Sequence, residues 1–355
     1  MCDMKLPQAD KTPSRRRPIR KIGILLVPGF ALMSYASAVE PFRAANHLSG
    51  RDLYVWRHIS TDGEPVRASN GVQIVPENAV GDVVDFDLLV VCAGGNPAEF
   101  EDGATLAWLR QVARSGTRIA GVSGGPLIVA RAGLLEGYRC TIHWEHVPGF
   151  IEEFPRHDLR RSLFEIDRDR LCCSGGTAAL DMMHVLIEED HGHEIASDVV
   201  EWFLHTHVRS GDGPQRMPVR ERLAVWDPKL VRVLEAMDEN LENPVSRQKL
   251  AGLASISVRQ LERLFKAHLG RSIADHYMEL RLRRARILLV QSTLSVLEVA
   301  VASGFISASH FSRAYKTRFG RSPRADRRPI LAQKPESLSH RSDSGSTSRL
   351  DKFVS

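Results

Sequence analysis

The sequence of 355 residues has little cysteine, no long apolar run and no strong excess of either charge. No stretch of 18 or more apolar residues occurs, so nothing in it indicates a transmembrane helix. Its five cysteines lack CxxC spacing and are odd in number, which argues against a zinc site and a disulfide framework. With 43% hydrophobic and 26% charged residues, the composition also excludes collagen-like and wholly disordered chains.

The cysteines that are present indicate a reducing compartment. Cys172 and Cys173 are adjacent, and Cys92 lies within an apolar run. This pattern predicts reduced, mostly buried thiols in a cytoplasmic protein. The histidines form no convincing metal-binding pattern, and no GxGxxG or GxxxxGKS loop occurs, so we expect neither a metal nor a cofactor.

The net charge of +5 conceals an uneven distribution. Residues 229–328 contain 19 Lys and Arg against 9 Asp and Glu, which gives this stretch +10 and leaves −5 for the rest. A basic end joined to a mildly acidic body indicates that only the end meets a polyanion such as DNA. A solvated basic face is the alternative that charge alone leaves open.

The length predicts two domains, at roughly 150 residues for each. We expect a disordered polar segment over 1–18, an α/β domain over 19–207 and a turn-rich linker over 208–226. A helical domain over 227–330 and a disordered serine-rich tail over 331–355 complete the prediction.

Short apolar runs alternate with helical patterns in the first domain. This alternation predicts a doubly wound parallel sheet with helices on both faces, where ligands bind beyond the carboxyl ends of the strands. The expected strands are Lys21–Val27, Leu53–Ser60, Asp87–Cys92 and Thr117–Val122. The expected helices are Ser34–Leu48, Ala104–Ser115 and Pro126–Ala132.

The strand ends carry the candidate ligand site. The backbone N–H groups exposed in the glycine turns there suit an anion or a carboxylate. We predict that the ligand-binding residues are Phe30, Glu40, Gly94, Gly95, Ser123, Gly124, His143, Trp144 and Glu145.

The stretch AGVSGGPLIVARAGLLEGYRCTIHWEH, residues 120–146, resembles the DJ-1/PfpI superfamily, which is related to class I glutamine amidotransferases. Gly121-Val122-Ser123-Gly124-Gly125 has the form of a nucleophile elbow. The resemblance places Glu40, Ser123 and His143 at the family's glutamate, nucleophile and histidine positions. The nucleophile position holds serine in place of cysteine, so we expect no catalytic residue and no enzyme. The alternative is an amidase or hydrolase that uses Ser123 and His143.

The second domain contains a near-repeat at an offset of 50 residues. SVRQLERLFKAHLGRS (257–272) aligns with SASHFSRAYKTRFGRS (307–322), and a short helical pattern and a turn precede each copy. This arrangement predicts two helix-turn-helix units. Arg and Gln suit base edges, while Lys suits phosphate. The predicted DNA-binding residues are Ser257, Arg259, Gln260, Arg263, Lys266, Ser307, Ser309, His310, Arg313 and Lys316.

The second domain resembles the DNA-binding domain of AraC/XylS regulators through Ala302-Ser303-Gly304-Phe305, Phe311-Ser312-Arg313 and Phe319-Gly320-Arg321-Ser322-Pro323. Joined to a DJ-1/PfpI-like domain, it resembles the GlxA-type regulators, and among them those of glycine betaine, carnitine and arginine catabolism. The resemblance implies a cytoplasmic homodimer that binds double-stranded promoter half-sites and RNA polymerase. It also implies an activator of catabolic genes whose small-molecule effector is a quaternary amine or a related amino acid. A constitutive architectural DNA-binding protein remains a third alternative.

Overall fold

The computed structural model describes residues 18–327 apart from 83–84 and 293. The predicted serine-rich tail and nearly all of the predicted N-terminal polar segment lie outside these residues. Among the helices of the described ranges, none combines the length and hydropathy that a membrane span needs.

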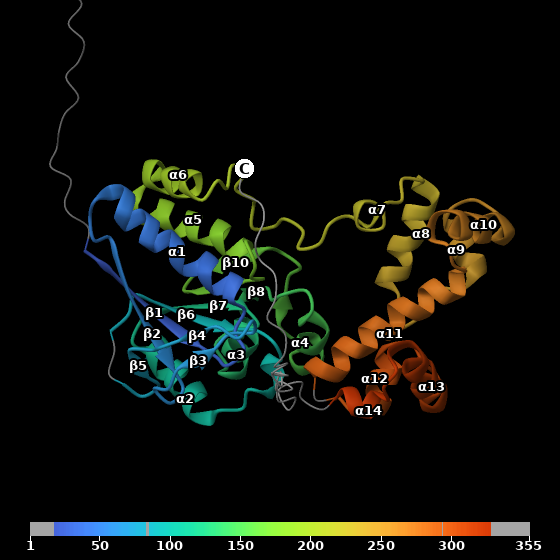
Figure 1. Cartoon of the computed structure of the whole chain (residues 1–355), viewed down its shortest axis with the longest axis horizontal. Coiled ribbons are helices and arrows are strands. Elements are labelled where there is room, and N and C mark those ends of the chain that lie inside the picture. The colour runs from blue at the N-terminus through green and yellow to red at the C-terminus, as the bar shows by residue number, and fades with distance from the viewer. Residues whose placement is uncertain (1–17, 83–84, 293, 328–355) are drawn as a thin grey trace, which may run out of the picture.

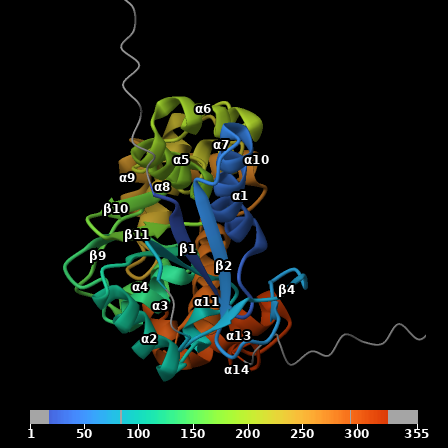
Figure 2. The ribbon, with the colours of Figure 1, turned by 90° about the vertical axis from the view of Figure 1, so that its left-hand side faces the viewer.

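A seven-stranded sheet forms the core of the N-terminal part, in the order β10-β11-β7-β6-β1-β2-β5. Its neighbouring strands pair in parallel, except that β10 is antiparallel to β11. Figure 2 shows β1 and β2 running side by side, with α1 next to them. The strands are β1 (Arg20–Leu26), β2 (Tyr54–Ser60), β5 (Asn78–Ala79), β6 (Leu88–Ala93), β7 (Arg118–Ser123), β10 (Phe164–Asp167) and β11 (Arg170–Cys173).

Helices cover both faces of this sheet. The central strand β6 is buried at every position, as expected for a parallel strand packed on both sides. On one face lie α1 (Leu32–Ser49), α5 (Ala178–His191) and α6 (His193–Trp202), while α2 (Gly103–Arg114) and α3 (Gly125–Arg131) lie on the other (Figure 1). This arrangement confirms the predicted doubly wound α/β fold. The prediction succeeded because strands that are buried on both faces appear in the sequence as short apolar runs.

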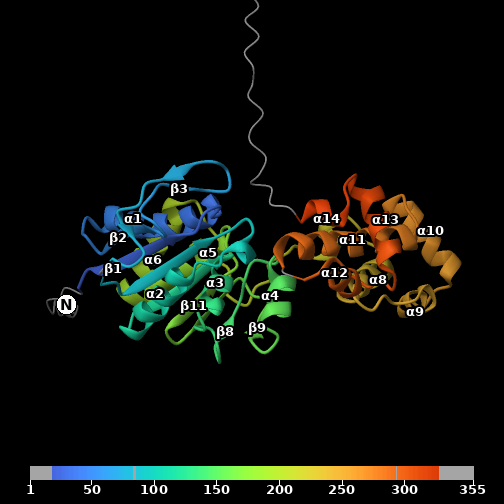
Figure 3. The same cartoon turned by 90° about the horizontal axis from the view of Figure 1, so that it is seen from below.

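Six shorter elements of the N-terminal part lie outside the seven-stranded sheet, and four of them pair into two small sheets, β3 with β4 and β8 with β9. They are β3 (Val66–Arg67), β4 (Gln73–Ile74), η1 (Pro97–Glu99), β8 (Arg139–Cys140), α4 (Val147–Glu153) and β9 (Asp158–Leu159). Of these, α4 and η1 face the C-terminal part and contact its long helix α11 (Ile273–Gln291), as Figure 3 shows for α4.

Helices are the only regular elements among the described residues of the C-terminal part. Asp227 caps α8 by accepting from the backbone N–H groups of Lys229 and Leu230, and Pro228 occupies the first turn. The helices are α7 (Val219–Arg222), α8 (Pro228–Glu239), α9 (Arg247–Leu253), α10 (Val258–Leu269), α11 (Ile273–Gln291), α12 (Val296–Ala302), α13 (Ala308–Phe319) and α14 (Pro323–Asp326).

Helix α11 connects two separate small cores. Its first turns contribute Ile273 and Tyr277 to a cluster with α8, α9 and α10. Its second half contributes Leu282 and Leu288 to a cluster with α12 and α13. Each cluster holds one helix-turn-helix unit, and Figure 1 shows α11 running between them. The spacing of the two units is therefore set by one continuous helix.

Candidate effector site and DNA-binding surface

Ser123 ends β7 in a sharp strand-to-helix turn. Its φ of 62° is left-handed, an uncommon conformation for a residue with a side chain. A Cβ at Gly125 would lie 2.0 Å from the Val91 carbonyl oxygen, and one at Gly121 would lie 2.6 Å from the Pro126 nitrogen. The backbone therefore approaches too closely at these two positions for any residue but glycine. The tight turn that they allow places Ser123 at the carboxyl end of the sheet.

Ser34, which the sequence did not single out, lies beside Ser123. A Cβ at Gly175 would be 2.7 Å from both the Ser34 Oγ and the Ser123 Cβ. The Ser34 Oγ also accepts a hydrogen bond of 2.7 Å from the Gly176 N–H. The ends of β7 and β11 and the first turn of α1 therefore meet at these two buried serines.

Glu40 takes a different position on α1. Its carboxylate lies 2.6 Å from the Arg43 Nε, and its side chain is 43% exposed. Six residues of helix separate Glu40 from Ser34, which is about 9 Å along the axis. Ser34 is the α1 side chain that the structure brings beside Ser123.

His143 reaches Ser123 through its backbone. Its N–H donates to the Ser123 carbonyl oxygen over 3.2 Å, whereas its ring Nδ1 lies 3.9 Å from the Glu145 Oε2. Burial lowers the pKa of His143, although Glu145 acts in the opposite direction. Within the described ranges, no hydrogen bond joins the His143 ring to the Ser123 hydroxyl.

The glycine turn after β6 packs tightly on the loop before α1. A Cβ at Gly94 would lie 2.7 Å from the Ala31 nitrogen, and Gly95 has a φ of +58°. Phe30 is fully buried, with its ring 5.6 Å from that of Tyr35. Phe30 is thus part of the core beneath the turn.

The ring of Trp144 forms a cation–π contact with an arginine of the interdomain linker. The Cζ of Arg216 lies 4.7 Å from the centroid of the Trp144 ring. The neighbouring Gln215 Nε2 donates to the Thr141 Oγ1 and the Ile142 carbonyl, each over 3.0 Å. The linker therefore lies directly on the segment that leads into Trp144. The sequence indicated only that the linker is polar. The charge of Arg216 was the local feature that could have pointed to a contact with an aromatic ring.

A buried carboxylate fixes the start of the same linker. Asp181 on α5 is fully buried, and its Oδ1 lies 2.7 Å from the His205 Nε2. Its Oδ2 accepts from the Arg209 Nη2 over 2.6 Å. This pairing compensates the buried charge and ties the linker to the α/β part.

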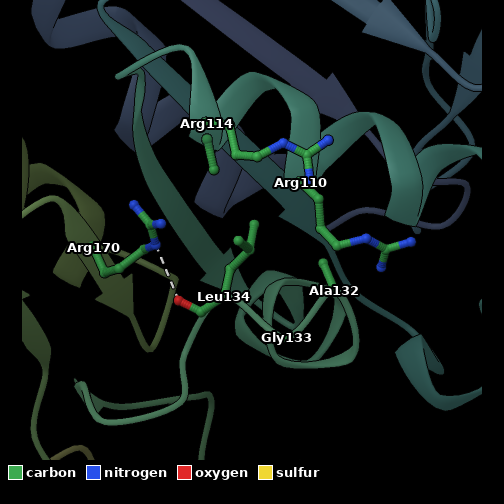
Figure 4. Close-up of a pocket in the computed structure, with 7 residues that line it drawn as sticks. Arg110, Arg114, Ala132, Gly133, Leu134 and Arg170 are labelled. Carbon is green, nitrogen blue, oxygen red and sulfur yellow. Dashed lines mark hydrogen bonds between the residues drawn. The ribbon is translucent and has the colours of Figure 1, made fainter.

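A basic pocket of about 230 Å³ lies away from the strand ends, between α2, α3 and β11. Figure 4 shows Arg170 directed at the Leu134 carbonyl, with a bond of 3.0 Å. Because Arg170 pairs with Ile119 at the start of β7, this pocket lies at the edge opposite Ser123. It is lined by Arg110, Ala113, Arg114, Ala132, Gly133, Leu134 and Arg170.

The first helix-turn-helix unit presents α10. Ser257 forms a capping box with Gln260, whose Oε1 accepts from the Ser257 N–H over 2.9 Å. Arg259 and Arg263 are exposed, while Leu261 and Phe265 face the core. The Lys266 Nζ donates to the Gly270 carbonyl over 3.2 Å at the end of the helix.

The second unit repeats this arrangement on α13. Ser307 caps the helix by accepting from the His310 N–H, while Phe311 and Tyr315 are buried. The predicted contact residues all lie on the exposed side of this helix: Ser309, His310, Arg313 and Lys316. The two predicted sets of side chains thus occupy matching faces of α10 and α13.

The turns of the two units differ by one residue. Ser255 and Gly304 occupy the matching left-handed position, with φ of 54° and 76°. Ser257 caps α10 two residues after Ser255, whereas Ser307 caps α13 three residues after Gly304. The additional residue is Ile306, whose side chain is completely exposed.

Two of the four arginines of α11, Arg281 and Arg284, are engaged inside the domain. Arg281 donates to the carbonyls of Ser303 and Gly304, and Arg284 donates to that of Ala302. Burial lowers the pKa of both guanidinium groups. They hold the turn of the second unit, so they are less free to bind DNA than a count of charges indicates.

Glu279 joins both units across α11. It forms ion pairs with Arg271 after α10, with Arg283 on α11 and with Arg318 on α13. Burial raises the pKa of Glu279, but the hydrogen bond from Arg318 and the charge of Arg283 outweigh it and bring the pKa to about 2. The charged carboxylate therefore braces the two units.

Comparison with known proteins gives two family matches. Residues 20–188 match the DJ-1/PfpI family, and residues 250–329 match a helix-turn-helix domain. The AraC family transcriptional regulator from Pseudomonas putida, a solved structure, aligns with 52% of this chain and 100% of its own, at 27% identity and a TM-score of 0.47.

Two regulators are similar over most of their length. The HTH-type transcriptional regulator GlxA of Rhizobium meliloti is 44% identical over 316 residues, which cover 89% of this chain and 98% of GlxA. The HTH-type transcriptional regulator GbdR of Pseudomonas aeruginosa is 42% identical over 319 residues, which cover 90% of this chain and 87% of GbdR. The chain belongs to this family of DNA-binding transcriptional regulators, which join a DJ-1/PfpI domain to an AraC-type helix-turn-helix domain.

Proposed function

We propose that this regulator activates catabolic genes when a small metabolite binds at the strand ends of its α/β domain. The linker supports this proposal, because Arg216 lies on the Trp144 ring and Gln215 is bonded to the preceding segment. A ligand at Trp144 changes the surroundings of the linker directly. It can shift the arrangement of the domains only if it binds one arrangement better than the other.

The effector in this proposal is a zwitterion with a quaternary ammonium group, such as glycine betaine or carnitine, or a related amino acid. Its cation competes with Arg216 for the Trp144 ring, since an aromatic face attracts either cation. Its carboxylate is received by the N–H groups of Gly94 and Gly95. The Gly124 N–H, which the sequence also offered, already donates to the Ala93 carbonyl over 3.0 Å. Competition with an internal cation gives the ligand a means to release the linker.

The same proposal assigns α10 and α13 to successive major grooves, about 10 base pairs apart. Both helices are capped and expose matched basic side chains, which suits this role. A cytoplasmic homodimer that contacts RNA polymerase would bind repeated half-sites. Membership of this family of regulators supports these partners.

We also propose that Ser123 is not a catalytic nucleophile. A serine hydroxyl requires a base, and the His143 ring is directed to Glu145. Ser123→Ala should therefore leave effector-dependent promoter activation intact. Loss of a hydrolytic activity in this variant would support the amidase or hydrolase alternative instead.

The effector is tested by thermal unfolding of the full chain with glycine betaine, carnitine, L-arginine and choline. A ligand that binds only the folded state raises the midpoint by mass action. We expect a zwitterion to raise it in the wild type and to do so much less in Trp144→Ala. Trp226→Ala, which removes an exposed tryptophan of the linker, is the matched control. Equal responses of Trp144→Ala and the wild type would contradict the assignment.

A further inference from the structure

A second cavity lies at the junction of the linker and the first helix-turn-helix unit. It has a volume of about 210 Å³ and lies between α7, α8 and α11. The lining is partly apolar, and its polar side chains are mostly cationic. The lining includes Arg216, Arg222, Leu223, Leu234, Asp238 and His276.

The charges that line this cavity do not balance. Four arginines face two carboxylates, and both carboxylates are already paired. Asp238 binds Arg222, and Glu279 binds Arg271 and Arg283. Arg216 has no carboxylate partner among the described residues, and its guanidinium lies over the face of Trp144. Stacking on a ring leaves the N–H groups at the edge of a guanidinium available to an anion.

Two buried polar atoms of the lining also lack partners. The Nδ1 of His276 and the Nε of Arg222 are buried and form no hydrogen bond within the described chain. His276 is only 6% exposed. Burial and the neighbouring Arg271 lower the pKa of His276, so the ring is neutral at pH 7 and one nitrogen carries a proton. Buried polar atoms are usually hydrogen-bonded, so these two are available to the oxygen of a bound anion.

We propose that this cavity binds a small monocarboxylate, separate from the effector at the strand ends. The carboxylate accepts hydrogen bonds from Arg216, Arg222 and His276, and a short aliphatic body lies against the leucines of the lining. The volume suits a molecule of a few carbon atoms, well below a drug-sized ligand. Arg216 contacts Trp144 and also lines this cavity. A carboxylate bound here therefore fixes the linker at the start of the DNA-binding domain.

The test is thermal unfolding and titration calorimetry of the full chain with sodium butyrate. Sodium chloride and sodium phosphate at equal ionic strength are the reference anions, since salt alone screens surface charge. We expect butyrate to stabilise the wild type saturably, and Arg216→Met and His276→Leu to weaken its affinity about tenfold or more. Arg220→Met removes an exposed arginine of α7 that does not line the cavity, and it should bind like the wild type.

Three results would overturn the proposal. The first is the absence of saturable stabilisation by butyrate in the wild type. The second is an affinity of Arg216→Met for butyrate equal to that of the wild type. This variant tests the proposal even if His276→Leu fails to fold. The third is saturable binding of phosphate without butyrate, which would show an inorganic anion site in place of a carboxylate site. None of these results bears on the zwitterion at Trp144, whose binding is measured separately.

Discussion

The Nδ1 of His146 lies 2.7 Å from the Oε1 of Gln291, and this contact joins the α/β domain to the end of α11. His146 is buried and follows directly on the His143–Glu145 segment. A Cβ at Gly149 would lie 2.5 Å from the Gln291 carbonyl oxygen, so α4 and α11 approach closely here. The candidate effector segment is thereby attached to the helix that spaces the two DNA-binding units.

Gln291→Ala should loosen this attachment. The substitution leaves the buried His146 nitrogen unpaired, which costs about 1–3 kcal/mol. We expect faster tryptic cleavage after Arg216 in the linker while both domains remain folded. Gln111→Ala, an exposed glutamine of α2, is the control and should be cleaved at the wild-type rate. Equal cleavage of Gln291→Ala and the wild type would show that other contacts hold the domains together.

The same contact predicts a dependence on pH. Burial and the neighbouring His143 lower the pKa of His146 to about 4, although the bond to Gln291 acts in the opposite direction. The unfolded chain, with an ordinary histidine pKa of about 6.5, binds more protons between these values than the folded chain does. The contribution of His146 to stability is therefore full above pH 6.5 and decreases as the pH falls towards 4.

This dependence is measured as the free energy of unfolding between pH 7.5 and 4.5. We expect a smaller decrease in His146→Phe than in the wild type, because phenylalanine does not titrate. His193→Phe is the control, since the His193 side chain is 78% exposed. The same slope in His146→Phe and the wild type would assign the acid sensitivity to other buried histidines.

The turn of the second helix-turn-helix unit predicts unequal effects of two glycine substitutions. Gly304 has a φ of +76°, and a Cβ there would lie 2.5 Å from the Leu241 carbonyl oxygen. Gly304→Ala should destabilise the domain by at least about 1–2 kcal/mol, the typical cost of a left-handed residue with a side chain. In Gly252, on α9, a Cβ meets nothing within 4 Å, so Gly252→Ala should stabilise by roughly 0.5–1 kcal/mol.

Urea unfolding of the full chain compares the two alanine variants. A Gly304→Ala protein as stable as the wild type would mean that the turn adjusts without cost. Equal destabilisation by Gly252→Ala would point to a general intolerance of side chains in these helices.

The sequence predicted the elements of the fold well, because their signals are local. The apolar runs before Cys92 and Ser123 match β6 and β7, and the duplicated pattern matches α10 and α13. Antiparallel β10 was not predicted, since its four residues alternate too briefly to be recognised. The sheet edge it forms is set by pairing with β11, which is a tertiary effect.

The site was less accessible to sequence reasoning, because its contacts join distant residues. Ser34 and Glu40 lie on the same helix, and only packing against Gly175 selects Ser34 as the neighbour of Ser123. Arg216 reaches Trp144 across 72 positions of the chain, beyond the range of any local pattern. The effector assignment therefore stays a prediction, although the fold around it is confirmed.

The exposed arginines of the two recognition helices predict base-specific binding. Arg263 lies on the exposed side of α10, where its planar guanidinium can bind a guanine edge with two hydrogen bonds. Arg263→Ala should weaken binding by about 1–3 kcal/mol and relax the preference at one base position. The Lys266 ammonium donates to the Gly270 carbonyl in the free protein. Because this side chain is exposed, it can exchange that hydrogen bond for one to a DNA phosphate.

The measurement starts from the DNA site that the wild type selects from a random-sequence pool. Gel-shift titrations then compare this site with its single-base variants. Lys266→Ala should weaken binding to all of them equally and flatten the salt dependence, because a phosphate contact carries no sequence information. Lys229→Ala, an exposed lysine at the start of α8, should change neither. If Arg263→Ala weakened all sites equally, the α10 side chain would face the backbone, and base recognition by the first unit would have to lie with Arg259 or Gln260.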